Sequence, residues 1–130
     1  MKEIKNSRII LDSDIIIDHL RGIISLDNLT DNSLGNTSLI SAVSIAEIYS
    51  LLYFNEIERA EKLFSTLKAV NIDSVIAKLA GGYRMIFYKS HNLLLPDALI
   101  AASAKISNAI LVTKNLKHFP MTDIDIIKPY

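Results

Sequence analysis

Short apolar runs alternate along the chain with longer segments whose apolar residues recur every three or four positions. The runs are rich in β-branched residues and are bounded by polar ones, which is typical of buried strands. On this basis we expect strands at residues 8–12, 39–43, 69–72, 109–113 and 123–127, the last at an edge of the sheet.

The segments between these runs have the spacing of amphipathic helices. We expect helices over "SDIIIDHLRG" up to Gly22, over residues 44–68 with a division near Asn55, from a cap at Asp73 to about Lys89, and from Pro96 to about Ser107. Because strands and helices alternate, the pattern predicts an α/β fold with a short, mainly parallel sheet flanked by helices, a three-layer sandwich. Residues 1–130 would form a single domain.

Two segments interrupt the periodic pattern. Residues 25–38, rich in Asn, Asp, Ser and Thr, predict a loop with at most a short helical turn. Gly81 and Gly82 fall inside an expected helix, where each glycine costs roughly 1 kcal/mol relative to alanine. We expect close packing against another helix to explain the pair.

Composition narrows the class of protein. Half of the 130 residues are hydrophobic and 22% are charged, as in a folded globule. No apolar run reaches the length of about 20 residues that spans a membrane, and the N-terminus lacks a secretory leader, so we expect a cytoplasmic protein. The absence of cysteine excludes disulfides and thiolate zinc sites.

Charge is unevenly distributed although the formal net charge is zero. Residues 1–83 hold 8 Lys and Arg against 11 Asp and Glu, whereas residues 84–130 hold 6 against 3. Such asymmetry is compatible with chance and also with a polyanionic partner of the basic part.

Three acids and one amide stand at junctions between expected strands and helices. Asp12 closes the first strand, Glu47 follows the second, Asp97 begins a helix, and Asn115 lies just beyond the strand at residues 109–113. Ligands of open parallel sheets bind beyond the carboxyl ends of the strands. These positions are therefore candidates for one functional site.

Each of the four also has a purely structural interpretation. Ser44 and Glu47 match a capping box, Asp97 would favour the positive end of its helix, Asp12 could cap the helix that follows it, and Asn115 could be a turn residue. A functional interpretation explains the acids together. Clustered carboxylates repel one another, and a hard divalent cation such as Mg²⁺ or Mn²⁺ removes that penalty. A bound cation of this kind activates water for phosphodiester hydrolysis.

Four motifs in order resemble the PIN-domain ribonucleases of the VapC toxin type. They are "IILDSDIIIDHLRG" at the start, "SIAE" at a helix start, "PDALIAASA" with its acid before an alanine-rich helix, and "LVTKNLKHF" near the end. The order and spacing match over essentially the whole chain. The resemblance implies a PIN-like fold and a metal-dependent endoribonuclease, the toxin of a type II toxin–antitoxin pair.

The resemblance also implies roles for individual residues. Asp12, Glu47 and Asp97 match the metal-coordinating acids, and Asn115 takes a fourth catalytic position where many members carry Asp. Ser13 takes the place of a threonine and keeps its hydroxyl. The family implies Mg²⁺ or Mn²⁺ as cofactor, a cognate antitoxin, a homodimer, and structured RNA such as transfer RNA as the usual target.

Basic residues near these motifs are candidate contacts for the RNA backbone. They are Arg21 at the end of the first helix, and Lys114, Lys117 and His118 after the last buried strand. Solvated surface is the alternative interpretation for each, and for His118 a plain loop residue.

Three other functions remain open from the sequence. Asn115 is compatible with a degenerate PIN scaffold that binds RNA or a protein without cleaving it. "ILDSDIII" also fits a haloacid-dehalogenase-like phosphatase with Asp12 as nucleophile, although no paired-acid loop follows "AILVT". A phosphoacceptor receiver domain would use "ILDSD" and the "IIKP" end.

Overall fold

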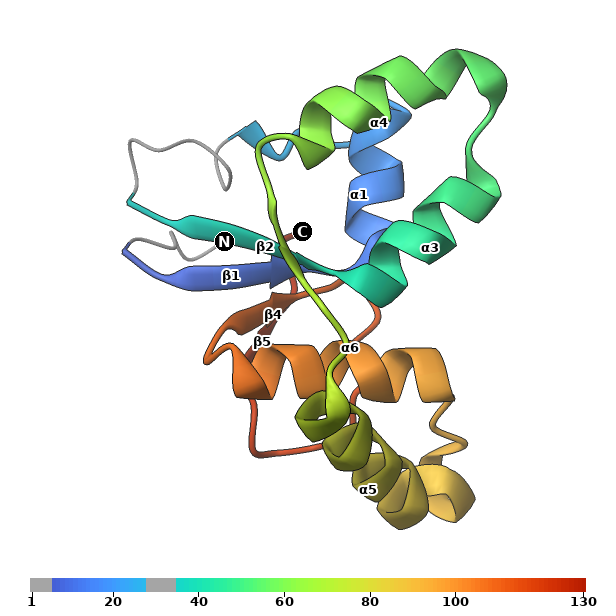
Figure 1. The fold of residues 1–130 in the computed structure, drawn as a ribbon, viewed down its shortest axis with the longest axis vertical. Helices are drawn as coiled ribbons and strands as arrows, with labels where there is room; N and C mark the ends of the chain where they lie inside the picture. Colours follow the sequence, from blue (N-terminus) through green and yellow to red (C-terminus); the bar gives the residue numbers. More distant parts are fainter. Residues whose placement is uncertain (1–5, 28–34) are drawn as a thin grey trace.

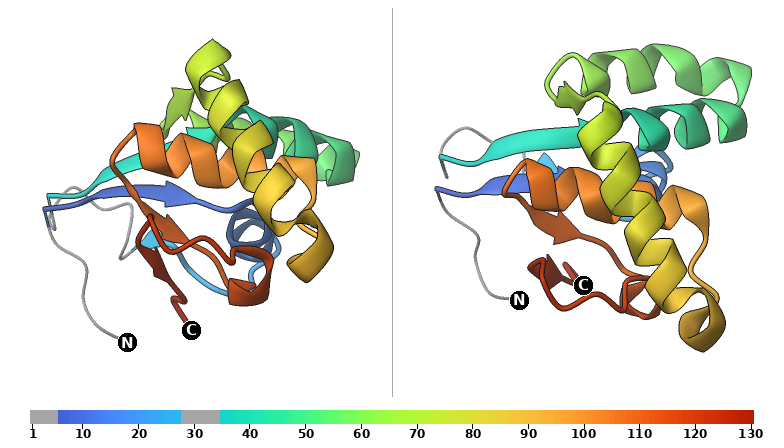
Figure 2. Two further views of the ribbon diagram at one scale, coloured as in Figure 1. Left: turned by 90° about the horizontal axis from the view of Figure 1, so that it is seen from below. Right: turned by 60° about the horizontal axis from the view of Figure 1, so that its bottom comes forward.

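The computed structural model describes residues 6–27 and 35–130 of the chain. A parallel sheet of five strands in the order β3-β2-β1-β4-β5 forms its centre (Figures 1 and 2). The strands are β1 (Arg8–Leu11), β2 (Thr37–Ser41), β3 (Lys68–Val70), β4 (Ile110–Val112) and β5 (Ile126–Ile127). All five expected strands are present and β5 is at an edge, as predicted. Much of the loop expected at residues 25–38 lies outside the described residues.

Helices cover both faces of the sheet, so the prediction of a three-layer α/β sandwich is confirmed (Figure 1). One layer holds α1 (Ser13–Leu20), α3 (Ala42–Leu51) and α4 (Ile57–Phe64), and the other holds α5 (Ser74–His91) and α6 (Leu95–Ile106). Short 3-10 helices, η2 (Phe54–Glu56) and η3 (Leu116–His118), complete the described elements. None of the helices described is both long and apolar enough to cross a membrane.

The strands contribute side chains to two separate cores. In β1, Ile9 and Leu11 pack with α1, α3 and α4, whereas Ile10 packs with α5 and α6. All three side chains are fully buried. Because successive residues of a strand point to opposite faces, a continuous apolar run is what a strand covered on both faces requires. Each such side chain contributes roughly 1.5–3 kcal/mol of burial free energy.

The second strand ends earlier than the sequence predicts. It stops at Ser41, whose hydroxyl accepts a hydrogen bond from the Val43 amide at 3.2 Å and so caps α3. Ser44 therefore lies inside α3, and Glu47 is the sixth residue of that helix instead of a first-turn residue. The predicted capping box between Ser44 and Glu47 is wrong, because a serine one turn earlier takes the capping position.

The glycine pair in α5 has no packing partner in the described part of the chain. A Cβ atom placed on Gly81 or Gly82 meets no atom within 4 Å outside its own surroundings in the helix. The expectation that close packing within the chain explains these glycines is wrong. The surface they leave is open to a second molecule.

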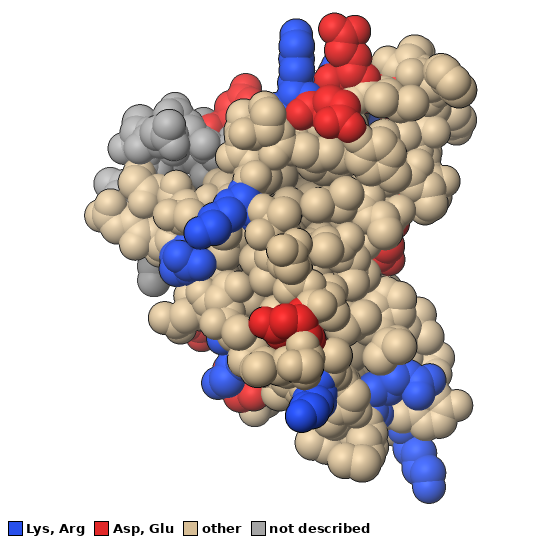
Figure 3. Space-filling view, in the orientation of Figure 1, with Lys and Arg blue, Asp and Glu red and all other residues tan. Residues whose placement is uncertain are grey.

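Charged side chains are interspersed on the face shown in Figure 3. Acidic groups are most frequent at its upper end and basic groups in its lower half, and broad uncharged areas separate most of them. This face thus carries charge of both signs.

Candidate active site

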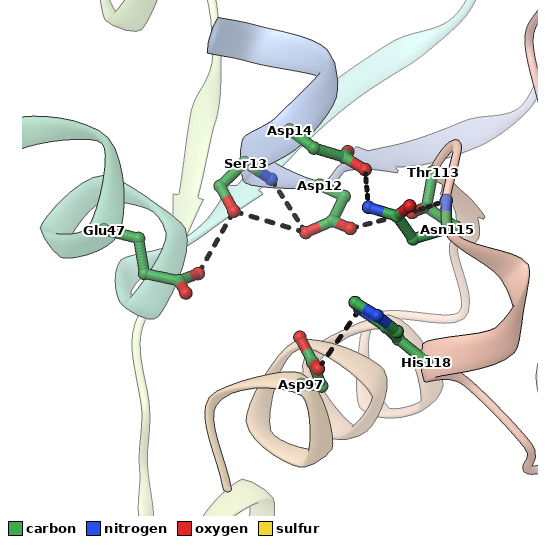
Figure 4. A network of polar contacts seen from close by, with 8 residues as sticks. All are labelled: Asp12, Ser13, Asp14, Glu47, Asp97, Thr113, Asn115 and His118. Atoms are coloured by element: carbon green, nitrogen blue, oxygen red, sulfur yellow. Dashed lines mark hydrogen bonds and ion pairs between the residues drawn. The ribbon is translucent and has the colours of Figure 1, made fainter. Parts of the chain in front are cut away.

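The four predicted site positions meet at one edge of the sheet. Parallel strands all end at the same edge, and Asp12 follows β1 there, while Glu47 lies on the helix after β2 and Asn115 follows β4. Asp97, in the first turn of α6, reaches the same edge from the opposite helical layer. Figure 4 shows Asp12 in the middle of the group, with Glu47 on one side and Asp97 facing it across an open space.

Both carboxylate oxygens of Asp12 are held by hydrogen bonds. The Ser13 amide donates to Oδ1 at 2.8 Å, and the Thr113 hydroxyl donates to Oδ2 at 2.8 Å. Asp12 is also the N-cap residue of α1, so its backbone conformation is set by the start of that helix. These contacts fix the direction in which Asp12 faces its neighbours.

Thr113 is a site residue that the sequence interpretation missed. Its side chain is fully buried, and its hydroxyl also accepts a hydrogen bond from the Asn115 amide at 3.1 Å. In the sequence it is the polar end of the run "AILVT", two residues before Asn115. A hydroxyl residue that ends a buried strand beside a predicted site was the available signal.

Ser13 connects two of the acids. Its hydroxyl donates to Glu47 Oε1 at 3.1 Å, and Oγ lies 3.4 Å from Asp12 Oδ1. Because a hydroxyl carries one proton, it can satisfy only one of these acceptors at a time. Ser13 therefore holds Glu47 close to Asp12 without removing the negative charge of either.

Asp14 and Asn115 form a second pair beside Asp12. The Asn115 side-chain amide donates to Asp14 Oδ2 at 2.7 Å. Asp14 Oδ1 is buried and has no hydrogen-bond partner among the described residues. A buried carboxylate oxygen without a partner costs about 1–3 kcal/mol, and a nearby cation would offset this cost.

The Asp97 carboxylate lies beside the other acids and has one weak ionic contact among the described residues. Its nearest ionic partner is His118, whose Nδ1 lies 3.7 Å from Asp97 Oδ2. Burial and the charge of Asp12 raise the pKa of Asp97 to about 6, with a smaller contribution from Glu47 and an opposing one from His118. His118 therefore contacts a proposed site residue, although more than half of its side chain is exposed (57%).

The pKa values of the neighbouring acids Asp14 and Glu47 are also raised. Burial, and then the charge of Asp12, raise the pKa of Asp14 to about 6. Burial also raises the pKa of Glu47, where Asp12 adds to the effect and the hydrogen bond from Ser13 opposes it. All three carboxyls thus carry a desolvation and repulsion cost that a nearby cation would offset.

These shifts predict the pH dependence of stability in the presence of a chelator. The ordinary pKa of an aspartate is near 3.9, so a folded-state value of about 6 means that the folded protein binds more protons between these two values. The free energy of unfolding should therefore rise as pH falls from about 7.5 to about 5. Urea unfolding in EDTA at several pH values measures this, and a stability that falls steadily over that range would contradict it.

The oxygen donors match a hard divalent cation. The group offers carboxylates from Asp12, Glu47, Asp97 and Asp14, including the unpartnered Asp14 Oδ1. Within residues 6–27 and 35–130, no three acidic or histidine side chains are already close enough to hold one ion. Mg²⁺ and Mn²⁺ keep several waters, so they need only a few protein oxygens, and rotation of the half-buried Glu47 and Asp97 side chains is compatible with such a site.

The predicted basic contacts separate into two groups. Lys114 lies next to the acids, and its ammonium donates to Asp18 Oδ2 at 2.6 Å, where the Tyr130 hydroxyl also donates at 2.7 Å. Arg21 is at the far end of α1, about 13–14 Å along the helix axis from Asp12, where it donates to the Leu51 carbonyl at 3.0 Å. The structure does not bring Arg21 to the site.

A buried pair of hydroxyls joins the two helices that carry Glu47 and Asp97. The Ser103 hydroxyl of α6 lies 3.2 Å from that of Ser41, the cap of α3, and both side chains are fully buried. Ser103 also contacts the Leu99 carbonyl of its own helix at 2.8 Å. This contact links the two helical layers at the end of the sheet where the acids meet.

Comparison with known proteins identifies the class to which this fold and site belong. The family model described as "PIN domain" matches residues 9–123, which is most of the chain. The protein therefore belongs to the PIN domain family.

Particular relatives agree with this assignment. Ribonuclease VapC10 from Mycobacterium tuberculosis is 36% identical over 115 residues, covering 87% of this chain and 86% of the relative. Among solved structures, VapBC2 from Rickettsia felis bound to a promoter DNA fragment has a TM-score of 0.79 at 23% identity, covering 92% of this chain and 97% of that one. A toxin–antitoxin complex from Klebsiella pneumoniae has a TM-score of 0.76 at 25% identity, covering 94% and 98%.

The family assignment removes two of the alternative functions. A receiver domain has the strand order 2-1-3-4-5, which differs from the order β3-β2-β1-β4-β5 found here. The haloacid-dehalogenase-like alternative is set aside because the PIN family model matches the chain.

Proposed function

We propose that this protein is a metal-dependent endoribonuclease, the toxin component of a type II toxin–antitoxin system. The observation that carries the proposal is the meeting of Asp12, Glu47 and Asp97 at one sheet edge, in a chain 36% identical to a ribonuclease. The unfavourable environment of Glu47 and Asp97 supports it, because burial and repulsion by Asp12 are costs that a purely structural site would not retain.

Mg²⁺ or Mn²⁺ is the proposed cofactor, held by Asp12, Glu47 and Asp97, with Asp14 and Asn115 as outer contacts. When bound, such a cation lowers the pKa of a water and polarises the phosphoryl oxygen. Thr113 and Ser13 orient the acids, because their hydroxyls contact Asp12 and Glu47. His118 is exposed enough to donate a hydrogen bond to a phosphate oxygen of the substrate.

Cleavage of RNA tests this function directly. Protein freed of any copurifying partner should cleave total RNA with Mg²⁺ or Mn²⁺ and not in EDTA. Asp12→Ala should remove the activity, which excludes a contaminating nuclease. Absence of cleavage with either metal would leave the non-cleaving scaffold as the better explanation. Sequencing of the fragments then tests whether structured RNA such as transfer RNA is the target.

We also propose a cognate antitoxin as protein partner. The fold is shared with a toxin–antitoxin complex at 25% identity over nearly the whole chain. Coexpression with the protein encoded beside it should yield a stable complex with reduced nuclease activity, and separate migration of the two proteins would contradict the pairing.

A homodimer through α5 is the third element of the proposal. Gly81 and Gly82 lie one helical turn before Met85 and Ile86, so the two adjacent pairs share one broad side of the helix. Met85 is 81% exposed and Ile86 66% exposed, and the glycines leave room for a second backbone to approach. Because the glycines have no side chains, this apolar side of α5 allows close contact between two copies of the helix.

Ile86→Asp should weaken this dimer by at least about 30-fold, because a buried charge at a dimer contact costs roughly 2 kcal/mol or more. Light scattering during size-exclusion chromatography measures the mass over a concentration series. Leu51→Asp is the matched control, since Leu51 is similarly exposed (56%) but lies on α3 in the other layer. An equal effect of both substitutions, or no effect of Ile86→Asp, would rule out α5 as the interface.

A further inference from the structure

A basic pocket adjoins the acidic group at the end of the sheet. It has a volume of about 430 Å³ and is lined by Lys114, Asn115, Leu116, Lys117, His118 and Lys128. Sites for small organic ligands occupy about 300–1,000 Å³, so the pocket can accept a nucleotide. No acidic residue lines it in the described part of the chain.

The topology explains how Lys128 joins residues that are distant in sequence. β4 and β5 are parallel neighbours with Val112 opposite Ile127, and the Thr113 amide donates to the Ile127 carbonyl at 3.1 Å. Lys128 directly follows β5, so it emerges at the same sheet edge as the segment after β4. In the sheet, β4 lies between β1 and β5, and adjacent strands are about 4.8 Å apart. Lys128 is therefore about two strand spacings to one side of Asp12.

The lysines of the pocket differ in how far their charge is already neutralised. The Lys114 ammonium is 2.6 Å from Asp18 Oδ2, so part of its attraction for an anion is compensated. Lys117 and Lys128 are exposed, and neither makes a hydrogen bond or ion pair within the described residues. The uncompensated positive charge of the pocket thus belongs to these two side chains.

The pocket and the acidic group share two residues. Asn115 donates to Asp14, and His118 contacts Asp97, while both also line the pocket. A polyanion whose scissile phosphate lies over the acids would therefore place a neighbouring phosphate in the pocket. Because the positive charge lies beside the acids and not among them, it attracts the RNA backbone without occupying the proposed cation position.

We propose that this pocket binds a phosphate of the RNA next to the scissile one, with Lys117 and Lys128 as its principal contacts and Lys114 held in place by Asp18. This proposal rests on the proposed ribonuclease function and adds Lys128 to the substrate-binding residues. Such contacts act through phosphate charge and are independent of base sequence.

Binding of RNA in the absence of metal tests the proposal apart from catalysis. The probe is a fluorescent oligouridylate of about 12 nucleotides, with fluorescence anisotropy recorded in EDTA over a series of salt concentrations. Lys117→Ala/Lys128→Ala should weaken binding about tenfold at low salt. The slope of log K against log salt should fall by about 0.7, the contribution of one single-strand phosphate contact, because both lysines contact the same phosphate.

Lys62→Ala/Lys68→Ala is the matched control. It removes the same charge, but Lys62 lies in the last turn of α4 and Lys68 begins β3, so both lie toward the opposite edge of the sheet. Thermal melts of all variants should agree, because the four ammonium groups make no hydrogen bond or ion pair within the residues described. The proposal that the pocket binds RNA would be wrong if both double variants lost affinity equally. It would also be wrong if Lys117→Ala/Lys128→Ala lost none.

Cleavage kinetics separate failure of the pocket from failure of the proposed function. If the wild type cleaves RNA, the pocket variant should raise KM and leave kcat nearly unchanged, as expected for contacts made equally in the ground and transition states. If the wild type is active and the variant has an unchanged KM, the proposal that the pocket binds RNA is wrong, while the proposed ribonuclease function stands. If the variant instead loses affinity for the antitoxin and keeps its affinity for RNA, the pocket is a protein-binding site and the proposal is wrong.

Discussion

Asp97→Asn is expected to lower RNA cleavage by more than about 100-fold while making the metal-free protein slightly more stable. Loss of an outer partner of a metal ligand already costs about 10–100-fold, and Asp97 is a proposed ligand itself. The gain in stability follows from the environment of the carboxyl, where burial and Asp12 raise the pKa to about 6. Asparagine keeps the shape and removes the charge.

The size of this gain can be bounded. A pKa of about 6 for Asp97 corresponds to ~3 kcal/mol for a fully enclosed carboxyl at neutral pH, and solvent screening of this partly exposed group reduces it to about 1 kcal/mol. The melting temperature in EDTA should then rise by about 4 °C. The gain is fully present above about pH 6 and is lost as pH falls to about 3, below both pKa values, where the wild-type carboxyl is protonated in the folded and unfolded states.

Calorimetry with and without Mg²⁺ measures both parts of the prediction. Mg²⁺ should raise the melting temperature of the wild type and have less effect on Asp97→Asn, since a ligand stabilises only the state that binds it. Asp125→Asn, at an exposed acid, is the control and should change neither activity nor the response to Mg²⁺. If Asp97→Asn melts many degrees below the wild type, Asp97 is a structural helix-end residue instead.

Thr113→Val should lower kcat/KM about 10–100-fold, the range expected for a residue that orients a ligand. Valine fills the same space but leaves Asp12 Oδ2 and the Asn115 amide without the hydroxyl that now contacts both. Losing the partner of a buried polar group costs about 1–3 kcal/mol, so the variant should also melt several degrees lower.

Thr113→Ser separates positioning from packing. Serine restores the hydroxyl and lacks one methyl group, which costs about 1 kcal/mol of burial. If Thr113 positions Asp12, Thr113→Ser should be about as active as the wild type, although it too is less stable. Equal losses of activity in the two variants would show that the methyl group matters and that the hydrogen bond to Asp12 does not.

Much of the fold follows from the apolar pattern because the sheet is buried on both sides. Strands such as β1 must then be continuously apolar, and the polar residue that ends each run marks the carboxyl edge. Asp12 was identifiable for this reason. That Glu47 and Asp97 lie near it follows from the parallel order of strands, which the sequence indicates only indirectly.

Other features depend on choices that local sequence cannot settle. Ser41 and Ser44 are both good helix caps, one turn apart, and only strand pairing decides between them. Thr113 is indistinguishable from a β-branched core residue until Asp12 is placed beside it. Lys128 reaches the pocket through the pairing of β4 with β5, which involves a strand of only two residues.

The double role of Asp12 bears on how such a protein could lose its activity in evolution. Asp12 caps α1 and is also a proposed ligand, so replacement by an apolar residue would remove the site and also weaken the helix start. Asparagine caps a helix about as well as aspartate, and a single base change converts one codon into the other. Inactive descendants that still fold should therefore arise most easily through Asn at this position, and they would keep the shape of the toxin while losing its chemistry.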